Sequence, residues 1–149
     1  MPTYLTTPLL DSPAQTLVNP VNTVGVMGKG LALAFKQRYP AMYQEYRRLC
    51  QQGRLQIGRL HVYQAPGKII VNFPTKKHWR QPSRIEYIEA GLEAFVTTYQ
   101  DYDISGVAFP QLGCGYGGLG WKEEVKPVME QYLKGLPIPV YIHVYVPDR

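Results

Sequence analysis

The sequence is short of cysteine and has no long apolar run. Its 149 residues include two cysteines, Cys50 and Cys114, too few for a disulfide framework, which favours a reducing, cytoplasmic setting. No segment approaches the roughly 20 apolar residues of a membrane-spanning helix. The N-terminal residues lack the basic and then apolar regions of a secretory signal. We therefore expect a cytoplasmic protein with no membrane partner.

Familiar ligand-binding signatures are also absent. The three histidines, at positions 61, 78 and 143, lack the spacing of metal ligands, and we expect no metal and no cofactor. In residues 19–30 neither the Gly-Lys-Ser/Thr of a P-loop nor the G-x-G-x-x-G spacing of a Rossmann fold occurs. No repeat, low-complexity tract or linker divides the chain, so residues 1–149 are interpreted as one domain.

Glycine, proline and positive charge are plentiful instead. The sequence has 14 glycines and 13 prolines, which predict many tight turns and functional loops. Its formal net charge of +5 favours a polyanionic partner such as nucleic acid, because neutralising phosphates releases counterions. Four basic residues within nine positions are interleaved with a histidine and a tryptophan: Lys76, Lys77, His78, Trp79, Arg80 and Arg84.

Apolar spacing predicts strands that alternate with helices. Strands are expected at residues 4–5, 16–20, 60–63, 69–73, 107–110 and 140–146, with a hairpin turn at 65–68. Helices are expected at 31–39, 40–53, 83–99 and 125–132, where Pro127 indicates a late start or a kink. Continuous apolar strands between helices predict a three-layer α/β/α fold whose sheet is mainly parallel and covered on both faces.

The start of the third predicted helix matches a known capping pattern. Ser83 and Glu86 have the spacing of a capping box, in which the Ser side chain reaches forward to a backbone N–H and the Glu reaches back. An apolar stripe at helical spacing follows this pair. The pattern predicts that the helix begins at Ser83.

Two Gly-rich segments lie where parallel sheets bind ligands, between a strand and a helix. In residues 19–30, glycines let the backbone approach a phosphate, and the Asn22 amide suits a ribose hydroxyl or an anomeric centre. Residues 110–121 contain five glycines within eight positions, an array of amides suited to a diphosphate. Either segment alone could be an ordinary turn or surface loop. Two of them in one small domain favour paired phosphate binding.

A cysteine and a lysine are further candidates for chemistry. Cys114 has no nearby histidine to activate it, so a structural role as a small buried apolar side chain is the favoured interpretation. Residues 75–80 are interpreted either as a solvated turn or as a nucleic-acid contact in which Trp79 stacks on a base. Lys76 follows the predicted strand 69–73, near a strand end and the expected pocket, where a lysine can act covalently or electrostatically.

Four segments in order, residues 18–22, 25–32, 72–77 and 110–115, resemble the macrodomain family. The similarity covers nearly the whole chain and is greatest for an antitoxin branch that removes ADP-ribose from DNA. The resemblance implies a mixed, mainly parallel six-stranded sheet between helices. It also implies an enzyme, an ADP-ribosyl glycohydrolase that hydrolyses the N-glycosidic bond to thymine bases in single-stranded DNA.

The resemblance implies partners as well as a reaction. ADP-ribose would be ligand and product, and ADP-ribosylated single-stranded DNA the substrate. Antitoxins of this branch oppose a DarT-type toxin and hold it through a C-terminal segment. We therefore expect residues 1–149 to be the N-terminal catalytic domain of a longer antitoxin, and to be monomeric.

The resemblance further implies roles for particular residues. Lys76 matches the catalytic lysine of this branch, and Asn22 would orient the distal ribose. ADP-ribose would be bound mainly by the two Gly-rich segments, through Leu9, Asn19, Val26, Met27, Gly28, Lys29, Gly30, Thr75, Gln111, Gly113, Cys114, Gly115, Tyr116 and Gly117. DNA would be bound by the basic segment, through Lys77, His78, Trp79 and Arg80.

Two departures from the family pattern leave alternatives open. Thr7-Pro8-Leu9 replaces the usual Gly-Asp whose Asp binds adenine, so adenine would depend on backbone near Leu9. A human relative that releases ADP-ribose from acidic side chains has an Asp where this chain has Gly117. Lys76 could attack the anomeric carbon or, as the ammonium, stabilise or protonate the departing thymine. Without the Asp, the second role is favoured.

Two other functions would use the same residues. A hydrolase of ADP-ribosylated acidic residues on protein would need the same pocket, and a non-catalytic ADP-ribose reader would need no Lys76. The basic segment around Trp79 favours DNA over an acidic protein side chain.

Overall fold

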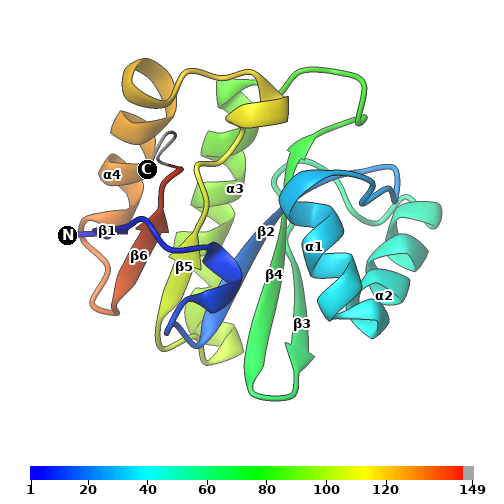
Figure 1. Cartoon of the computed structure of the whole chain (residues 1–149), viewed down its shortest axis with the longest axis horizontal. Coiled ribbons are helices and arrows are strands. Elements are labelled where there is room, and N and C mark those ends of the chain that lie inside the picture. The colour runs from blue at the N-terminus through cyan, green and yellow to red at the C-terminus, as the bar shows by residue number, and fades with distance from the viewer. Residues whose placement is uncertain (146–149) are drawn as a thin grey trace.

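A six-stranded sheet forms the middle layer of the protein in the computed structural model, which describes residues 1–145 (Figure 1). The strands are β1 (Thr3–Leu5), β2 (Thr16–Asn22), β3 (His61–Ala65), β4 (Lys68–Lys76), β5 (Val107–Phe109) and β6 (Val140–His143). Their order is β1-β6-β5-β2-β4-β3. Every pair is parallel except β3 with β4, which form the predicted hairpin. The predicted fold class, with its mixed and mainly parallel sheet, is confirmed.

Helices cover both faces of the sheet (Figure 1). One face carries α1 (Gly30–Arg38) and α2 (Pro40–Gln51), and the other carries α3 (Ile85–Thr98) and α4 (Lys126–Leu133). Short 3-10 turns occur at Leu9–Asp11, Tyr99–Tyr102 and Gly115–Gly117, and a π-helical turn at Trp121–Val125 precedes α4. The predicted alternative of a late start is not what the structure shows: the π-helical turn runs directly into α4, and Pro127 lies in the first turn of α4, where proline is tolerated.

The central strands are apolar at consecutive positions because their two faces serve two cores. Leu17 of β2 packs in the core under α1 and α2, together with Phe35 and Tyr46. Its neighbour Val18 packs in the core under α3 and α4, together with Phe95. Successive side chains of a strand point to opposite faces, and here both faces are dry.

The capping box predicted for α3 is wrong. The helix begins at Ile85, and its N-cap residue, Arg84, makes no side-chain capping bond. The Ser83 hydroxyl donates instead to the carbonyl oxygen of Thr75, at the end of β4, and Ser83 is buried. The Ser83 hydroxyl, which the local pattern assigned to capping the helix, is therefore used in a contact with β4, outside the helix.

Strand ends differ modestly from those predicted. β2 and β4 run further towards their carboxyl ends than expected, to Asn22 and Lys76. β6 ends at His143, and Val146, the last residue of the predicted strand, lies outside the described residues. The extension matters for the site, because it makes Asn22 and Lys76 neighbours in the sheet.

Within residues 1–145 no helix combines the length and apolar character needed to cross a membrane.

Gly91 tests how tightly the α3 core is filled. A Cβ at Gly91 would lie 2.2 Å from Cζ of Phe73, a side chain with no exposed surface. Alanine would gain about 1 kcal/mol of helix propensity, but overpacking a filled core costs about 1–3 kcal/mol, and this contact is severe. We expect Gly91→Ala to lower the free energy of unfolding by about 1–2 kcal/mol in urea denaturation.

Gly135→Ala is the matched control for this substitution. A Cβ at Gly135 would meet no atom within 4 Å, so its effect should stay within about 0.5 kcal/mol. A Gly91→Ala protein as stable as the parent would show that the Phe73 ring can move aside.

Candidate active site

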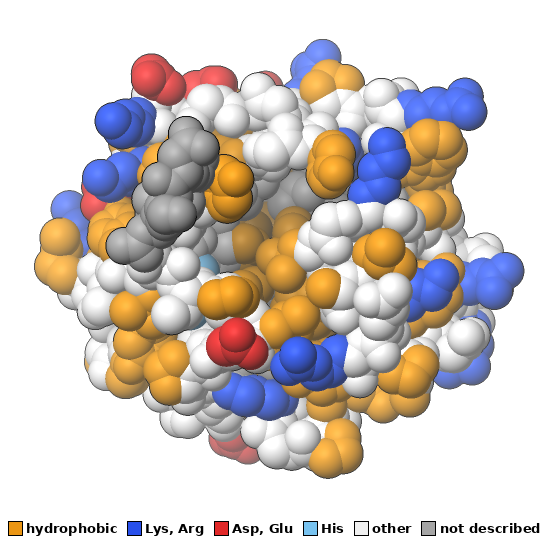
Figure 2. Space-filling view, in the orientation of Figure 1, with side chains coloured by type: hydrophobic (Ala, Val, Ile, Leu, Met, Phe, Trp, Pro, Cys, Tyr) orange, Lys and Arg blue, Asp and Glu red, His pale blue; other side chains and the backbone are white. Residues whose placement is uncertain are grey.

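Three loops meet where the carboxyl ends of β2, β4 and β5 come together (Figure 1). The first loop, residues 23–29, leads into α1; the basic loop, residues 77–84, leads into α3; the second loop, residues 110–120, follows β5. Figure 2 shows this face of the protein hollowed near its centre, with apolar side chains along the hollow. The strands thus bring the three sequence segments of interest to one place.

The first loop is shaped by the side chain of Asn22. Its Nδ2 donates to the carbonyl oxygen of Val26 at 2.8 Å, and its Oδ1 accepts from the backbone N–H groups of Val24 at 3.1 Å and Val26 at 3.3 Å. The hydroxyl of Tyr46 donates to the same Oδ1 at 2.9 Å. Among the described residues, one N–H of the Asn22 amide has no partner, and that donor is the one left for a ligand.

A buried polar chain lies beneath the first loop. Asn19 donates to Asn72 at 3.0 Å, and Asn72 donates to Nδ1 of His61 at 2.9 Å. Nδ1 of His61 therefore accepts, and Nε2 carries the hydrogen that is donated to Glu45 at 2.6 Å. Within the described part of the chain, Oδ1 of Asn19 is buried without a partner. This row of hydrogen bonds was not predicted, and its one visible sign in the sequence is Asn72 inside an apolar strand.

Two predicted ligand contacts belong to this buried layer. Asn19 and Met27 are almost completely buried, and Nδ2 of Asn19 lies 3.8 Å from the Met27 sulfur. Leu9 is buried as well. The side chains of these three residues are buried, whereas Gly28, Lys29 and Gly30 are exposed.

Lys76 ends β4 directly beside Asn22, its partner in the β2–β4 register. Its ammonium donates to the carbonyl oxygen of Trp79 at 3.4 Å. Partial burial lowers the pKa of Lys76, and the positive charge of Lys29 lowers this pKa further. A larger share of Lys76 is therefore neutral near pH 7 than for a free lysine, and its ammonium is a stronger acid.

The second loop reaches over the start of α1. Tyr116, 70% exposed, packs so closely on Gly30 that a Cβ there would lie 3.0 Å from its ring, and the Lys29 ammonium lies 5.5 Å from the ring centre. The N-cap residue of α1, Lys29, makes no side-chain capping bond, and helix N-termini of this kind can bind anions through their first N–H groups. Tyr116 of the second loop therefore lies beside the start of α1.

Ser83 ties the second loop to β4. Its hydroxyl holds Thr75, and its backbone N–H donates to the carbonyl oxygen of Gly117 at 2.9 Å. At Gly113 the backbone has a φ of +73°, and a Cβ would lie 3.0 Å from the Ser83 hydroxyl and 2.8 Å from Leu119. Glycine is therefore required at 113 for both its backbone and its space.

Cys114 is not a nucleophile in this arrangement. The thiol is half-buried and lies 3.7 Å from the carbonyl oxygen of Leu112, to which it donates. Burial, with a smaller effect of the Glu124 charge, raises the pKa of Cys114 to about 11. The thiolate is therefore scarce at neutral pH, in agreement with the structural interpretation of this residue.

The basic loop projects beside the first loop. The Thr23 hydroxyl donates to the carbonyl oxygen of Lys77 at 2.8 Å. Trp79 is 43% exposed, with the Arg80 guanidinium 4.6 Å from its ring centre and the His78 ring 5.1 Å away. The four predicted DNA-binding residues therefore lie together at the surface. Gln111, by contrast, uses its side-chain oxygen to accept from the backbone of Tyr145.

Among residues 1–145, no group of three or more His, Cys, Asp or Glu side chains is placed to hold a metal ion.

Known proteins are similar to this chain in sequence and in fold. The sequence model of the Macro domain family matches residues 18–128. A DNA ADP-ribosyl glycohydrolase of Thermus aquaticus is 49% identical over 139 residues, which cover 89% of this chain and 39% of that relative. The chain therefore spans about two fifths of the length of this curated relative.

Solved structures are equally similar. The macrodomain of Mycobacterium tuberculosis DarG superposes with a TM-score of 0.91 at 44% identity, over 99% of both chains. Thermosipho africanus DarTG in complex with ADP-ribose superposes with a TM-score of 0.88 at 38% identity, over 95% of this chain and 41% of that one. A curated protein of the same organism, a DNA ADP-ribosyl transferase-DNA ADP-ribosyl glycohydrolase fusion protein, is 38% identical over 91% of this chain and 39% of its own length.

Removing the Ser83 hydroxyl should weaken the link between β4 and the second loop. Ser83→Ala leaves the buried carbonyl of Thr75 without its donor, which costs about 1–3 kcal/mol of unfolding free energy. Glu86→Gln is the control, because Glu86 makes no capping bond, and it should change stability by less than about 0.5 kcal/mol. The free energy of unfolding of both variants is measured by denaturant titration. An equal loss of stability in the two variants would support the predicted capping box instead.

Removing the charge of Lys29 should raise the pKa of Lys76. Lys29→Met abolishes the smaller of the two causes that lower this pKa, so the shift is only partly reversed. NMR titration of isotopically methylated lysines measures it. Lys36→Met, on α1 and packed on Tyr43, should leave the Lys76 titration unchanged. An unchanged titration in Lys29→Met would leave burial as the whole cause.

Proposed function

The chain belongs to the macrodomain family, and we propose that it is an ADP-ribosyl glycohydrolase that removes ADP-ribose from thymine bases in single-stranded DNA. One observation carries this proposal: an amine of lowered pKa, Lys76, ends β4 beside Asn22, at the edge of the sheet where the two Gly-rich loops also begin. The name of the Thermus aquaticus relative supports the DNA substrate. The structure of Thermosipho africanus DarTG, determined with ADP-ribose, supports the ligand.

ADP-ribose would lie across the three loops. The diphosphate would lie against the N-terminus of α1 and the amides of the second loop, beneath Tyr116. The distal ribose would then reach the free N–H of Asn22, with its anomeric carbon near the Lys76 amine. Loops already shaped by internal hydrogen bonds would hold the reacting bond in place, so that binding energy is used for positioning.

The reaction is hydrolysis of the bond between the anomeric carbon and a thymine nitrogen. Water supplies a hydroxyl to the anomeric carbon, which carries positive charge as the bond breaks, and the electron pair stays on the nitrogen. The Lys76 ammonium stabilises that developing negative charge and donates the proton, and the proton of the attacking water restores it. A lowered pKa brings the acidity of Lys76 closer to that of the thymine imide.

Asn22 and the basic loop have supporting roles. Asn22 orients the ribose with its remaining donor and keeps the first loop in shape through its other hydrogen bonds. Lys77 to Arg80 contact DNA, with the exposed face of Trp79 available to a base. The intact protein opposes a DarT-type toxin and this catalytic part is monomeric; the fusion of transferase and glycohydrolase in a Thermosipho africanus relative supports the toxin partner.

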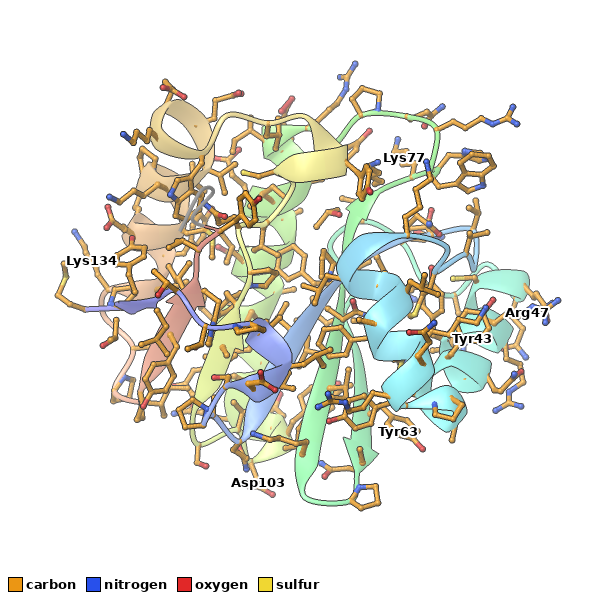
Figure 3. The ribbon with its side chains drawn as sticks, in the orientation of Figure 1. Tyr43, Arg47, Tyr63, Lys77, Asp103 and Lys134 are labelled. Carbon is orange, nitrogen blue, oxygen red and sulfur yellow. The ribbon has the colours of Figure 1, made fainter. Side chains whose placement is uncertain are left out.

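Lys76→Ala should abolish turnover without abolishing binding. Loss of an acid catalyst lowers kcat by about 10²-fold or more, whereas the affinity for free ADP-ribose should change only slightly. Release is followed from a single-stranded oligonucleotide that carries ADP-ribose on thymine, beside a Glu-linked ADP-ribosylated protein, and binding by calorimetry. Lys134→Ala, on the opposite side of the molecule (Figure 3), should behave like the parent.

The two substrates separate the proposal from its competitors. Release from the protein alone would make the chain a hydrolase of ADP-ribosylated acidic residues, and ADP-ribose binding without turnover of either substrate would leave a reader. The pH dependence tests the acid role: the rate should fall as pH rises through the lowered pKa of Lys76.

A further inference from the structure

Positive charge is distributed very unevenly along the chain. Residues 22–84 contain 12 Lys and Arg but a single acidic residue, Glu45. The other 86 residues contain four Lys and Arg and ten Asp and Glu, so the net charges of the two parts are +11 and −6. The basic part comprises the first loop, α1, α2, the β3–β4 hairpin and the basic loop, which form one side of the molecule (Figures 1 and 2).

Among residues 1–145, no carboxylate forms an ion pair with a Lys or Arg of this side. Its one acidic residue, Glu45, accepts a hydrogen bond from Nε2 of His61 at 2.6 Å. On α2, Arg47 and Arg48 are exposed and line a shallow groove together with Gln44 and Gln51. Unpaired guanidinium groups beside amide side chains can bind phosphate groups.

The α2 arginines are continuous with the active site. Arg47 packs against the first loop: a Cβ at Gly25 would lie 3.6 Å from Cγ of Arg47. Tyr43, one turn earlier on α2, donates to the carbonyl oxygen of Gly25 at 3.1 Å. Figure 3 shows Tyr43 and Arg47 on the same side of the molecule as Lys77. A surface therefore runs from the basic loop over the first loop to α2.

The middle of this surface is apolar. Val24 and Val26 of the first loop are 45% and 39% exposed, and exposed Trp79 lies on the adjoining basic loop. Proteins that bind single strands combine cations for the backbone with apolar and aromatic side chains for unstacked bases. A duplex, whose bases are stacked inside, would make no use of the apolar side chains.

We infer that single-stranded DNA leaves the active site across Val24 and Val26 and continues along α2, where Arg47 and Arg48 contact its phosphates. The inference rests on the proposed function, because it takes the modified thymine to be held at Lys76. It assigns α2, outside the ADP-ribose loops, to DNA binding. This surface, formed by Val24, Val26, Arg47 and Arg48, is called the DNA tract. The tract gives affinity for the strand and leaves the chemistry at Lys76 unchanged.

Neutralising both arginines tests the tract. Arg47→Gln/Arg48→Gln keeps the Cγ packing against Gly25 and removes two charges. Affinity for an unmodified single strand of about 15 nucleotides, a length within the range of such sites, is measured by fluorescence anisotropy at several salt concentrations. The plot of log K against log salt has a negative slope, and each lost phosphate contact makes it shallower by about 0.7. We therefore expect the slope of the double variant to be less negative by about 1.4, and its binding at low salt to be about tenfold weaker.

The control removes the same net charge elsewhere. Lys122→Gln/Lys134→Gln alters the acidic part of the chain and should retain the parent slope. In turnover, the arginine variant should show a KM about tenfold higher for the long modified strand, with kcat, turnover of a modified strand of about three nucleotides and ADP-ribose affinity unchanged. These unchanged values also show that the variant is folded.

Three results would overturn the tract: no salt-dependent binding by the parent, an unchanged slope in the arginine variant, or an equal loss in the lysine control. Failure of the proposed function looks different. If the parent releases no ADP-ribose from DNA but binds single strands through Arg47 and Arg48, the glycohydrolase assignment is wrong and the DNA-binding surface stands.

Discussion

β2 and β4 pair in parallel from Thr16 opposite Ile69 to Val21 opposite Pro74, and a register shift after Val21 then brings Lys76 opposite Asn22. This register places the amide that shapes the first loop beside the amine proposed to act on the ribose. It also decides which core each side chain enters, since a slip of one residue would turn every side chain to the other face. Two dry cores, one beneath α1 and α2 and the other beneath α3 and α4, hold the pairing in place.

The loops at the carboxyl ends of these strands have little regular structure, and side chains bonded to backbone groups hold them. Asn22 holds the first loop, Thr23 links it to the basic loop, and Ser83 links β4 to the second loop. A diphosphate would therefore meet backbone amides that are already in place, and little ordering entropy would be lost on binding. Glycine at 113 follows from the same requirement, because a side chain there would displace Ser83.

Positive charge has two effects at this end of the sheet. Lys29 lies near Tyr116 at the expected diphosphate site and also lowers the pKa of Lys76. A bound diphosphate would offset part of that second effect by bringing negative charge near both amines. With its single carboxylate bound to His61, the basic part of the chain attracts polyanions over a distance set by the salt concentration.

The sequence by itself determined the order of the elements, the sheet covered on both faces, the Gly-rich loops and the place of Lys76 in the loop region after a strand, because these follow from local periodicity and from turn residues. Pro40 at the start of α2 and the hairpin at 65–68 are further examples. Only the tertiary structure decided which partner each polar group takes. Ser83 matched a capping box but bonds to Thr75, Asn72 joins Asn19 to His61, and Arg47 lies against Gly25. These contacts join residues whose proximity depends on strand register and helix packing, and no local pattern in the sequence encodes that proximity.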